Sequence, residues 1–235
     1  MSKLWAMTLT TEDGPGQTIA KACFSAILLP SCREDRHWGY VCDNSQPKSF
    51  REPDAKALFL TSLHRLAAAY VDRDEQTGSS AFPAARIIKE DAAQALRRFD
   101  HDTVDCVVTS PPYFGVADYV KAQRLSMEWF GEDIESVRKT EIGARSKRHR
   151  NRALDEYIAE LTAVFVEVHR VMRPGGIATV VFGQSPSRAD AQETFKDALL
   201  WIGFSVEKEM IRQIPVGRRQ MPSVVRETVF ILGKN

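Results

Sequence analysis

The sequence predicts an α/β protein whose sheet is mostly parallel and ends in a C-terminal antiparallel hairpin, with a helical segment in front of it. From Phe82 onward, β-rich apolar runs alternate with segments whose apolar residues recur at helical spacing. Such alternation is typical of a largely parallel sheet with helices packed against it. The run IATVVFG (177–183) is continuously β-rich, as expected of a strand buried on both faces. The last two β-rich runs flank PVGRRQMPSVV (215–225) with no helix between them, which predicts the hairpin.

The elements expected in this region follow one another with short connections. We predict strands at 85–92, 104–110, 177–183, 205–214 and 227–233, and helices at 93–99, 155–172 and 188–204. The longest helix has apolar residues at helical spacing from Ile158 to Val171, and PGG (174–176) is placed to stop it before the next strand. Open α/β sheets carry their sites at the carboxyl ends of strands, where TSPPY (109–113) and GQSPSR (183–188) fall.

The first eighty residues have a different pattern. TIAKACFSAILL (18–29) and DAKALFLTSLHRLAAAYV (54–71) predict helices, and HWGYVCDNSQPKSFREP (37–53) between them is irregular. We therefore expect a helical N-terminal segment at 1–80 and an α/β domain at 81–235, joined by a polar connector that contains Gly and Ser.

Composition argues against several classes of protein. A net charge of +1 at pH 7 disfavours a chain that binds polyanions over its whole surface. The four cysteines have no C-x-x-C spacing, which argues against a zinc site, and we expect no bound metal. No apolar stretch reaches about 18 residues, so we expect no membrane-spanning helix. The N-terminus lacks the pattern of a secretory signal, and we expect a cytoplasmic protein with free thiols.

TSPPY (109–113) directly follows the apolar run VDCVV (104–108). Neither Pro111 nor Pro112 has an N–H group to donate to a neighbouring strand, so the strand cannot continue through them. One interpretation is an ordinary turn. The other is a rigid loop at the carboxyl end of a strand, because proline fixes φ and holds the neighbouring carbonyl group without a flexible backbone.

In this context TSPPY resembles the catalytic motif of the amino-methyltransferases, which methylate the exocyclic amine of cytosine or adenine in double-stranded DNA. The resemblance runs from about Phe82 to the last residue and includes GVADYVKAQRLSMEWFG (115–131), EIGAR (141–145) and RVMRPGG (170–176). It implies S-adenosyl-L-methionine as the cofactor, a role in DNA methylation of the restriction-modification kind, and a Rossmann-like methyltransferase sheet. That sheet is incomplete if part of the fold lies elsewhere.

The resemblance also implies roles for the motif residues. Ser110 and the backbone carbonyl of Pro111 accept the N–H bonds of the amine, Pro112 helps to keep the loop rigid, and Tyr113 stacks on the flipped-out base. An amine conjugated to its ring is a poor nucleophile, and acceptors held against its N–H bonds favour a more localised lone pair. Serine before PPY is more typical of cytosine-N4 enzymes than of adenine-N6 enzymes, so cytosine is favoured.

By the same resemblance, cofactor binding is expected at Asp91, Thr109 and Ser110. In relatives an acid at the position of Asp91 accepts a hydrogen bond from the adenine amine of the cofactor; the alternative is a helix N-cap. The sequence has no D-x-F-x-G-x-G turn, whose glycines let the backbone approach the cofactor. GPG (14–16) after WAMTLT (5–10) has the order strand, turn, helix, but it lacks the aromatic residue and the spacing.

The missing turn leaves two interpretations. In the first, a second protein chain carries the glycine-rich cofactor loop, and this chain is the catalytic half of a split enzyme. HWGYVCDNSQPK (37–48) supports it, because it resembles a segment that follows the glycine-rich part in one-chain relatives. In the second, the chain is a catalytically inactive DNA-binding or regulatory subunit, against which the intact TSPPY argues. An RNA or protein-glutamine methyltransferase is the alternative among enzymes.

Basic residues gather in two places. RKTEIGARSKRHRNR (138–152) is either a solvated face or a strip that contacts DNA phosphates, and GRRQMP (217–222) lies in the expected turn of the hairpin. The residues expected to bind nucleic acid are Arg145, Lys147, Arg148, Arg150, Arg218 and Arg219. Arginine suits phosphate and guanine contacts, whereas simple solvation of a turn explains the last two equally well.

Overall fold

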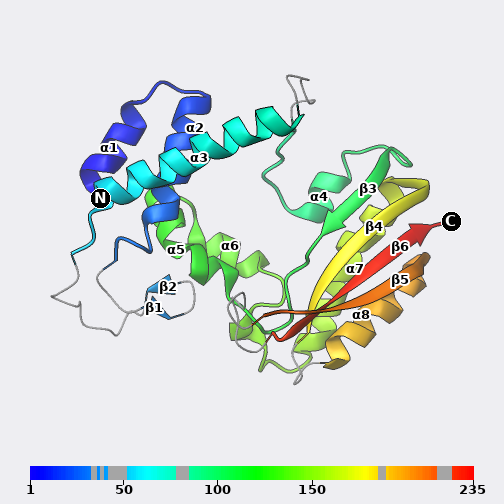
Figure 1. Cartoon of the computed structure of the whole chain (residues 1–235). Helices are drawn as coiled ribbons and strands as arrows, with labels where there is room; N and C mark the ends of the chain where they lie inside the picture. Colours follow the sequence, from blue (N-terminus) through cyan, green and yellow to red (C-terminus); the bar gives the residue numbers. More distant parts are fainter. Residues whose placement is uncertain (33–35, 38–39, 42–51, 78–84, 185–188, 216–223) are drawn as a thin grey trace. The chain divides into compact units, whose positions relative to one another are not determined.

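The computed structural model describes the chain except for residues 33–35, 38–39, 42–51, 78–84, 185–188 and 216–223 (Figure 1). The described residues form two compact units. The N-terminal unit comprises Met1–Ala85 and Val120–Val137, and the sheet unit comprises Arg86–Tyr119 and Arg138–Asn235. The stretch 120–137, expected in the domain 81–235, thus groups with the N-terminal segment, because its aromatic residues pack against the first two helices.

The N-terminal unit is mainly helical. Its elements are α1 (Ser2–Thr10), α2 (Pro15–Ile27), α3 (Ala55–Thr77), most of α5 (Tyr119–Phe130), the first part of α6 (Ile134–Thr140), and the short antiparallel strands β1 (Arg36–His37) and β2 (Tyr40–Val41). The helices predicted at 18–29 and 54–71 are confirmed by α2 and α3. HWGYVCDNSQPK (37–48) lies largely outside the described residues.

WAMTLT (5–10) lies in helix α1, so the strand considered ahead of GPG is wrong. The Trp5 ring packs against Phe24 of α2 and Trp129 of α5, with ring centroids 4.9 and 5.9 Å apart. This aromatic packing outweighs the β preference of the segment, since strand propensity depends strongly on tertiary context. Pro15 is the first residue of α2, so GPG begins a helix that follows a helix and does not form a cofactor turn.

The sheet unit contains a four-stranded sheet in the order β3-β4-β6-β5 (Figure 1). The strands are β3 (Val104–Thr109), β4 (Met172–Gln184), β5 (Phe204–Gln213) and β6 (Arg226–Lys234). The helices wholly within this unit are α4 (Ala92–Leu96), α7 (Ala153–Val171) and α8 (Ala189–Ile202), with a 3-10 turn, η1 (Arg145–Lys147). β3 and β4 are parallel, whereas β6 runs antiparallel to β4 and β5. The α/β class and the C-terminal hairpin are confirmed, and the described sheet is mixed.

The sheet is mixed because β6 runs antiparallel to both of its neighbours, and the strand expected at 85–92 does not form. Residues 85–89 have no regular structure, and the side chain of Ile87 is 90% exposed. An apolar run makes a strand only when a neighbouring strand accepts its hydrogen bonds, and no described strand of the sheet unit does so here.

PGG (174–176) lies inside β4, so the prediction that it separates helix from strand is wrong. Helix α7 ends at Val171 and β4 begins at Met172. The ladder with β3 is irregular between Met172 and Ile177, and Gly175 there has a φ of +76°. The glycine pair therefore forms a bulge that absorbs the extra residues of β4.

The core of the sheet unit lies between the sheet and helices α7 and α8. Alternate residues of β4 and β6 face these helices, because side chains along a strand point to opposite faces. The buried set comprises Ala178, Val180, Phe182, Phe230 and Leu232 of the strands, Tyr157, Leu161 and Phe165 of α7, and Phe195 and Leu199 of α8. A slip of one residue would expose each strand's buried row, so this pattern fixes the register that positions the ends of the strands.

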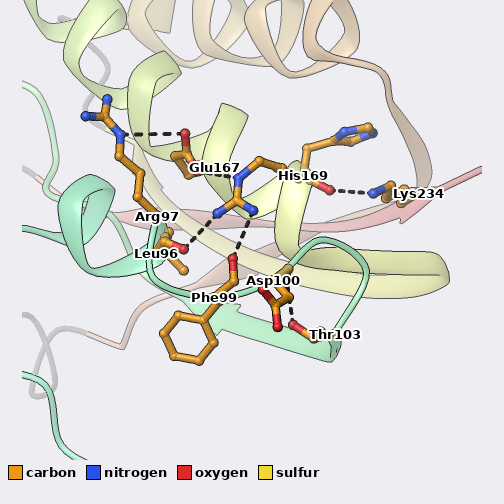
Figure 2. Close-up of polar contacts among 9 residues, drawn as sticks. Leu96, Arg97, Phe99, Asp100, Thr103, Glu167, His169 and Lys234 are labelled. Carbon is orange, nitrogen blue, oxygen red and sulfur yellow. Dashed lines mark hydrogen bonds and ion pairs between the residues drawn. The ribbon is translucent and has the colours of Figure 1, made fainter.

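Two cations hold the backbone at the amino ends of β3 and β4, as Figure 2 shows. Arg170 of α7 donates to the carbonyl oxygens of Leu96 (2.8 Å) and Phe99 (2.9 Å), and its Nε donates to the Glu167 carboxylate at 2.6 Å. Lys234 of β6 donates to the carbonyl oxygen of His169 at 2.8 Å. It also donates to the carbonyl of the first residue of β4 at 2.7 Å. We call Arg170, Glu167 and Lys234 the amino-end clamp.

Candidate active site

TSPPY (109–113) lies at the carboxyl end of β3, as predicted. Thr109 is the last residue of the strand and pairs with Val180 of β4. Ser110 is exposed, whereas Pro111 is buried. The ladder thus ends one residue before Ser110, and the prolines turn the chain away from the sheet.

The buried phenol of Tyr157 anchors the Pro-Pro turn. Tyr157, on α7, is 1% exposed, and its hydroxyl donates to the carbonyl oxygen of Pro112 at 2.8 Å. Burial raises the pKa of this phenol well above its ordinary value, so it remains a donor at physiological pH. The Pro112 carbonyl is therefore engaged within the protein, and the loop is held against the helix.

Ser110, Tyr113 and Glu227 form a chain of polar contacts beside this turn. The Ser110 hydroxyl lies 3.0 Å from the Tyr113 hydroxyl and donates to the Val181 carbonyl oxygen at 3.1 Å. The Tyr113 hydroxyl donates to Glu227 Oε1 at 3.2 Å, and Glu227 Oε2 is ion-paired with Arg212. Burial raises the pKa of Tyr113 to about 12, and the Glu227 carboxylate acts in the same direction. The phenol is therefore protonated at neutral pH.

The ring of Tyr113 lies directly over the backbone of Gly183. A Cβ atom at position 183 would come within 2.0 Å of the Tyr113 ring, which is far closer than two carbon atoms can approach. Gly183 therefore makes room for the ring, and any larger residue would displace it. The ring also packs against Phe182, with centroids 6.0 Å apart.

EIGAR (141–145) is bound alongside the residues that follow the motif. The backbone N–H of Gly115 donates to the carbonyl oxygen of Gly143 at 2.8 Å, and the N–H of Arg145 donates to the carbonyl oxygen of Ala117 at the same distance. The side chain of Glu141 accepts the backbone N–H of Tyr119. Gly143 has a φ of +65°, and a Cβ there would lie 2.7 Å from the Tyr157 ring. EIGAR therefore supports the residues that follow the TSPPY loop.

These contacts involve residues to which the sequence reasoning assigned no role. Tyr157 lay within the helix predicted at 155–172 but outside its apolar positions, and the hydroxyl of a buried tyrosine usually has a fixed partner. Gly183 ended a predicted strand, and a strand glycine signals close approach of another group. For Glu227 the only signal was an acid at the start of the last strand, which pattern alone does not distinguish from a solvated one.

Residues 104–235, more than half of the chain, match the sequence profile of the family N6_N4_Mtase, described as DNA methylase. The chain belongs to this family. The cofactor expected from the sequence, S-adenosyl-L-methionine, fits membership of this family. The methylase motif expected from TSPPY is thus confirmed at the level of the family.

Relatives of this methylase include two type II methyltransferases. M.SmaI from Serratia marcescens is 29% identical over 114 residues, which make up 48% of this chain and 31% of M.SmaI. M.SfiI from Streptomyces fimbriatus is 25% identical over 114 residues, or 48% of this chain and 22% of M.SfiI. The aligned segment therefore spans less than a third of either relative.

Solved structures similar to this chain include two described as DNA methylases. The PvuII DNA methyltransferase (cytosine-N4-specific) matches 62% of this chain and 48% of its own, with 16% identity and a TM-score of 0.40. TTHA0409 from Thermus thermophilus, described as a putative DNA modification methylase, matches 64% of this chain and 54% of its own, with 20% identity and a TM-score of 0.40. Another structure of TTHA0409 is a complex with S-adenosyl-L-methionine.

The residues expected to bind the cofactor lie in two different places, one at the start of helix α4 and the others at the end of strand β3. Asp91 is exposed and caps helix α4, its Oδ1 accepting the backbone N–H of Gln94 at 3.1 Å. The N-cap is therefore observed, and the contact with the cofactor stays a prediction. Thr109 and Ser110 stand at the end of β3. The fit to S-adenosyl-L-methionine is partial, since no glycine-rich turn accompanies these residues in the sequence.

The basic residues of the methylase differ in how they are engaged. Lys147 donates to the carbonyl oxygens of Lys139 (3.2 Å) and Glu141 (2.7 Å), so its ammonium supports the EIGAR segment. Arg148 donates to the Arg145 carbonyl at 2.8 Å. Arg150 forms an exposed ion pair with Glu156 at 3.3 Å. The side chain of Arg145 is exposed. Contacts of these residues with DNA stay a prediction.

Two further expectations touch on the rest of the chain. Arg218 and Arg219 lie outside the described residues. Within the described part, no helix has the length and apolarity needed to cross a membrane, and no group of three or more metal-ligating side chains is placed to hold an ion.

Proposed function

We propose that this chain is the catalytic part of a DNA methyltransferase that transfers a methyl group from S-adenosyl-L-methionine to an exocyclic base amine. The N4 amine of cytosine is favoured over the N6 amine of adenine, because serine precedes PPY. The observation that carries the proposal is the TSPPY loop of a DNA methylase family member, held rigidly at the carboxyl end of β3 with Ser110 exposed.

The loop suits a planar amine. Ser110 Oγ and the carbonyl oxygen of Pro111 accept its N–H bonds, which localises the lone pair and stabilises the charge that develops on nitrogen. The Pro112 carbonyl is held by Tyr157, and this contact fixes the turn that aims the neighbouring Pro111 carbonyl. A target base reaches this loop only by leaving the duplex stack, and Tyr113 contributes the aromatic surface beside it. S-adenosyl-L-methionine supplies an activated methyl group on its sulfonium.

The proposal includes a second protein chain that carries the glycine-rich cofactor loop. β3 is an edge strand of the described sheet, since β4 pairs with one side of it and no described strand pairs with the other. Val108 of β3 is 75% exposed, and Cys106 on the same face is exposed as well. Exposed apolar edge strands recruit further strands. A strand that leads into a D-x-F-x-G-x-G turn would cover this edge and bring the turn to the same end of the sheet as Ser110.

Double-stranded DNA is the proposed substrate partner, and the basic side chains after EIGAR contribute to its binding. Arg145 and Arg150 are exposed there, and arginine pairs with phosphate through several N–H groups. A type II modification enzyme, as in the restriction-modification relatives M.SmaI and M.SfiI, is the setting that the proposal implies.

The deciding experiment combines this chain with its companion. The companion is sought in the adjacent reading frame, by its D-x-F-x-G-x-G turn. We expect transfer of tritiated methyl groups from S-adenosyl-L-methionine to duplex DNA only when both chains are present. Mass spectrometry of the digested DNA then identifies the base, with N4-methylcytosine expected.

Other outcomes would correct separate parts of the proposal. Tight one-to-one binding of S-adenosyl-L-methionine by this chain alone, in calorimetry, would remove the second chain and leave methyl transfer intact. Methylation of RNA but not of DNA would favour the RNA methyltransferase. DNA binding without transfer by any combination of chains would favour the inactive regulatory subunit.

A further inference from the structure

The hydrogen bonds that begin at Ser110 and pass through Tyr113 end at the carboxylate of Glu227, which is also ion-paired with Arg212. Gly183 of β4, Glu227 of β6 and Arg212 of β5 are direct cross-strand neighbours in the register of the sheet. The glycine makes room for the Tyr113 ring, the glutamate receives its hydroxyl, and the arginine holds the glutamate. Three adjacent strands thus contribute one residue each to the placement of Tyr113.

The number of hydrogens decides the direction of these contacts. A carboxylate in an ion pair only accepts hydrogen bonds, and Glu227 is ion-paired with Arg212. Tyr113 has one hydroxyl hydrogen, which lies within reach of both Glu227 and Ser110. A bond to a charged acceptor is roughly twice as strong as one to a neutral acceptor. The hydrogen of Tyr113 therefore goes to Glu227.

Ser110 is then left as an acceptor. With the Tyr113 hydrogen committed, the contact between the two hydroxyls has no donor except Ser110, whose hydrogen goes either to Tyr113 or to the Val181 carbonyl. In both cases the Ser110 hydrogen points into the protein. Its oxygen accepts from neither of these groups, so its lone pairs remain for the N–H bond of an incoming amine.

We propose that Glu227 is a positioning residue that, through Tyr113, keeps the Ser110 hydroxyl oriented as an acceptor toward the substrate amine. The inference rests on the methyl-transfer function proposed above and adds a residue outside the TSPPY motif to it. Arg212 completes the device by fixing which carboxylate oxygen faces Tyr113.

Glu227→Gln is expected to reverse the direction of the hydrogen bonds that link residue 227, Tyr113 and Ser110, with little change in the shape of the side chain. Arg212 would bind the amide oxygen of the new side chain, which turns its NH₂ group toward Tyr113. The NH₂ group donates to the phenol, and the phenol is then free to donate to Ser110 and occupy one of its lone pairs. We expect the single-turnover rate of methyl transfer to fall about tenfold, with little change in KM for DNA.

A double-mutant cycle separates this role from a merely structural one. In a Tyr113→Phe background the link between residue 227 and Ser110 is already cut, so Glu227→Gln is expected to change the rate by less than about twofold. The matched control is Glu209→Gln, another strand glutamate held in an ion pair, here with Lys196; its activity is expected to equal that of the wild type. A tenfold loss from Glu227→Gln in both backgrounds would overturn the inference.

A second measurement does not depend on methyl transfer. In protein labelled with ¹³Cζ-tyrosine, the Tyr113 signal is assigned by its loss in Tyr113→Phe, and its ionisation is followed at alkaline pH. Because the Glu227 carboxylate contributes to the raised pKa of Tyr113, Glu227→Gln is expected to lower that pKa and Glu209→Gln to leave it unchanged. An unaltered pKa in Glu227→Gln would refute the contact even if the enzyme is active. A lowered pKa in a chain that never methylates would instead count against the proposed function alone.

Discussion

The two ends of the sheet unit treat their hydrogen-bond acceptors in opposite ways. At the amino end, the clamp cations Arg170 and Lys234 donate to four backbone carbonyl oxygens, and Figure 2 shows the contact of Lys234 with His169. At the carboxyl end, the hydroxyls of Ser110 and Tyr113 lead to the carboxylate of Glu227. At the first end the cations engage these carbonyl oxygens, whereas at the second end the contacts run mainly between side chains, and Glu227 is also ion-paired with Arg212.

This difference distinguishes a structural site from a site that is built to take a substrate. The carbonyl oxygens that Arg170 and Lys234 bind are engaged within the protein, and these contacts contribute to stability. Where an exposed hydroxyl keeps its lone pairs, a substrate N–H group finds an acceptor already in place, with little reorganisation. The polar groups that hold the fold and those proposed to bind the substrate therefore lie at opposite ends of the sheet.

The largest effect is expected from removing the acceptor at the carboxyl end. Ser110→Ala should lower methyl transfer by at least about 100-fold, because the amine loses a preorganised partner in the transition state. The melting temperature should be unchanged, since Ser110 is exposed. The matched control is Ser205→Ala at the other end of the sheet, whose hydroxyl bonds to Glu207. Equal activity of the Ser110 variant and this control would place the site elsewhere.

The next effect, on stability, is expected from breaking the amino-end clamp. Arg170→Met leaves the carbonyls of Leu96 and Phe99 without their donor. The Glu167 carboxylate loses its closer cation and keeps only Arg97, at 3.7 Å. The free energy of unfolding, measured in urea by circular dichroism, should fall by about 2–4 kcal/mol.

Methyl transfer per folded molecule should be unchanged in Arg170→Met. For comparison, Arg98→Met removes an ion pair in which the arginine is mostly exposed, and should cost at most about 1 kcal/mol. If Arg170→Met remained folded but lost methyl transfer, the amino end of the sheet would be coupled to the TSPPY loop at its carboxyl end.

A smaller effect on both properties is expected from Tyr157, which anchors the TSPPY turn at the carboxyl end. Tyr157→Phe keeps the ring and removes only the bond to the Pro112 carbonyl. Unfolding free energy should fall by about 1 kcal/mol, and transfer should slow by roughly tenfold because the turn loses its anchor. Tyr70→Phe, at an exposed tyrosine of the N-terminal unit, serves as the control. Full activity in Tyr157→Phe would mean that the prolines alone hold the loop.

The sequence predicted the local parts of this arrangement well, and the long-range parts poorly. The place of TSPPY at the end of a strand follows from an apolar run that stops at two prolines, which is local chemistry. The partner of Tyr113 is Glu227, 114 residues away. The register of the sheet brings these two residues together, and neither local sequence pattern predicts their contact. WAMTLT and the stretch 85–92 were misread as strands for a related reason, since a strand exists only where a neighbouring strand pairs with it.

The smallest effect is expected from the basic residues at and just after EIGAR. There a cation bound to backbone carbonyls, Lys147, lies two residues from an exposed cation, Arg145. Lys147 behaves like the amino-end clamp, because its ammonium is bound to the carbonyls of Lys139 and Glu141, whereas the side chain of Arg145 is exposed. Arg145→Gln should therefore reduce the slope of log DNA affinity against log salt by about one unit and leave stability unchanged. Lys147→Met should cost about 1 kcal/mol of stability, and its slope should change less than that of Arg145→Gln. Reversed outcomes would mean that Lys147 gives up its carbonyls to reach phosphate, so that the support of EIGAR and the binding of DNA compete for one side chain.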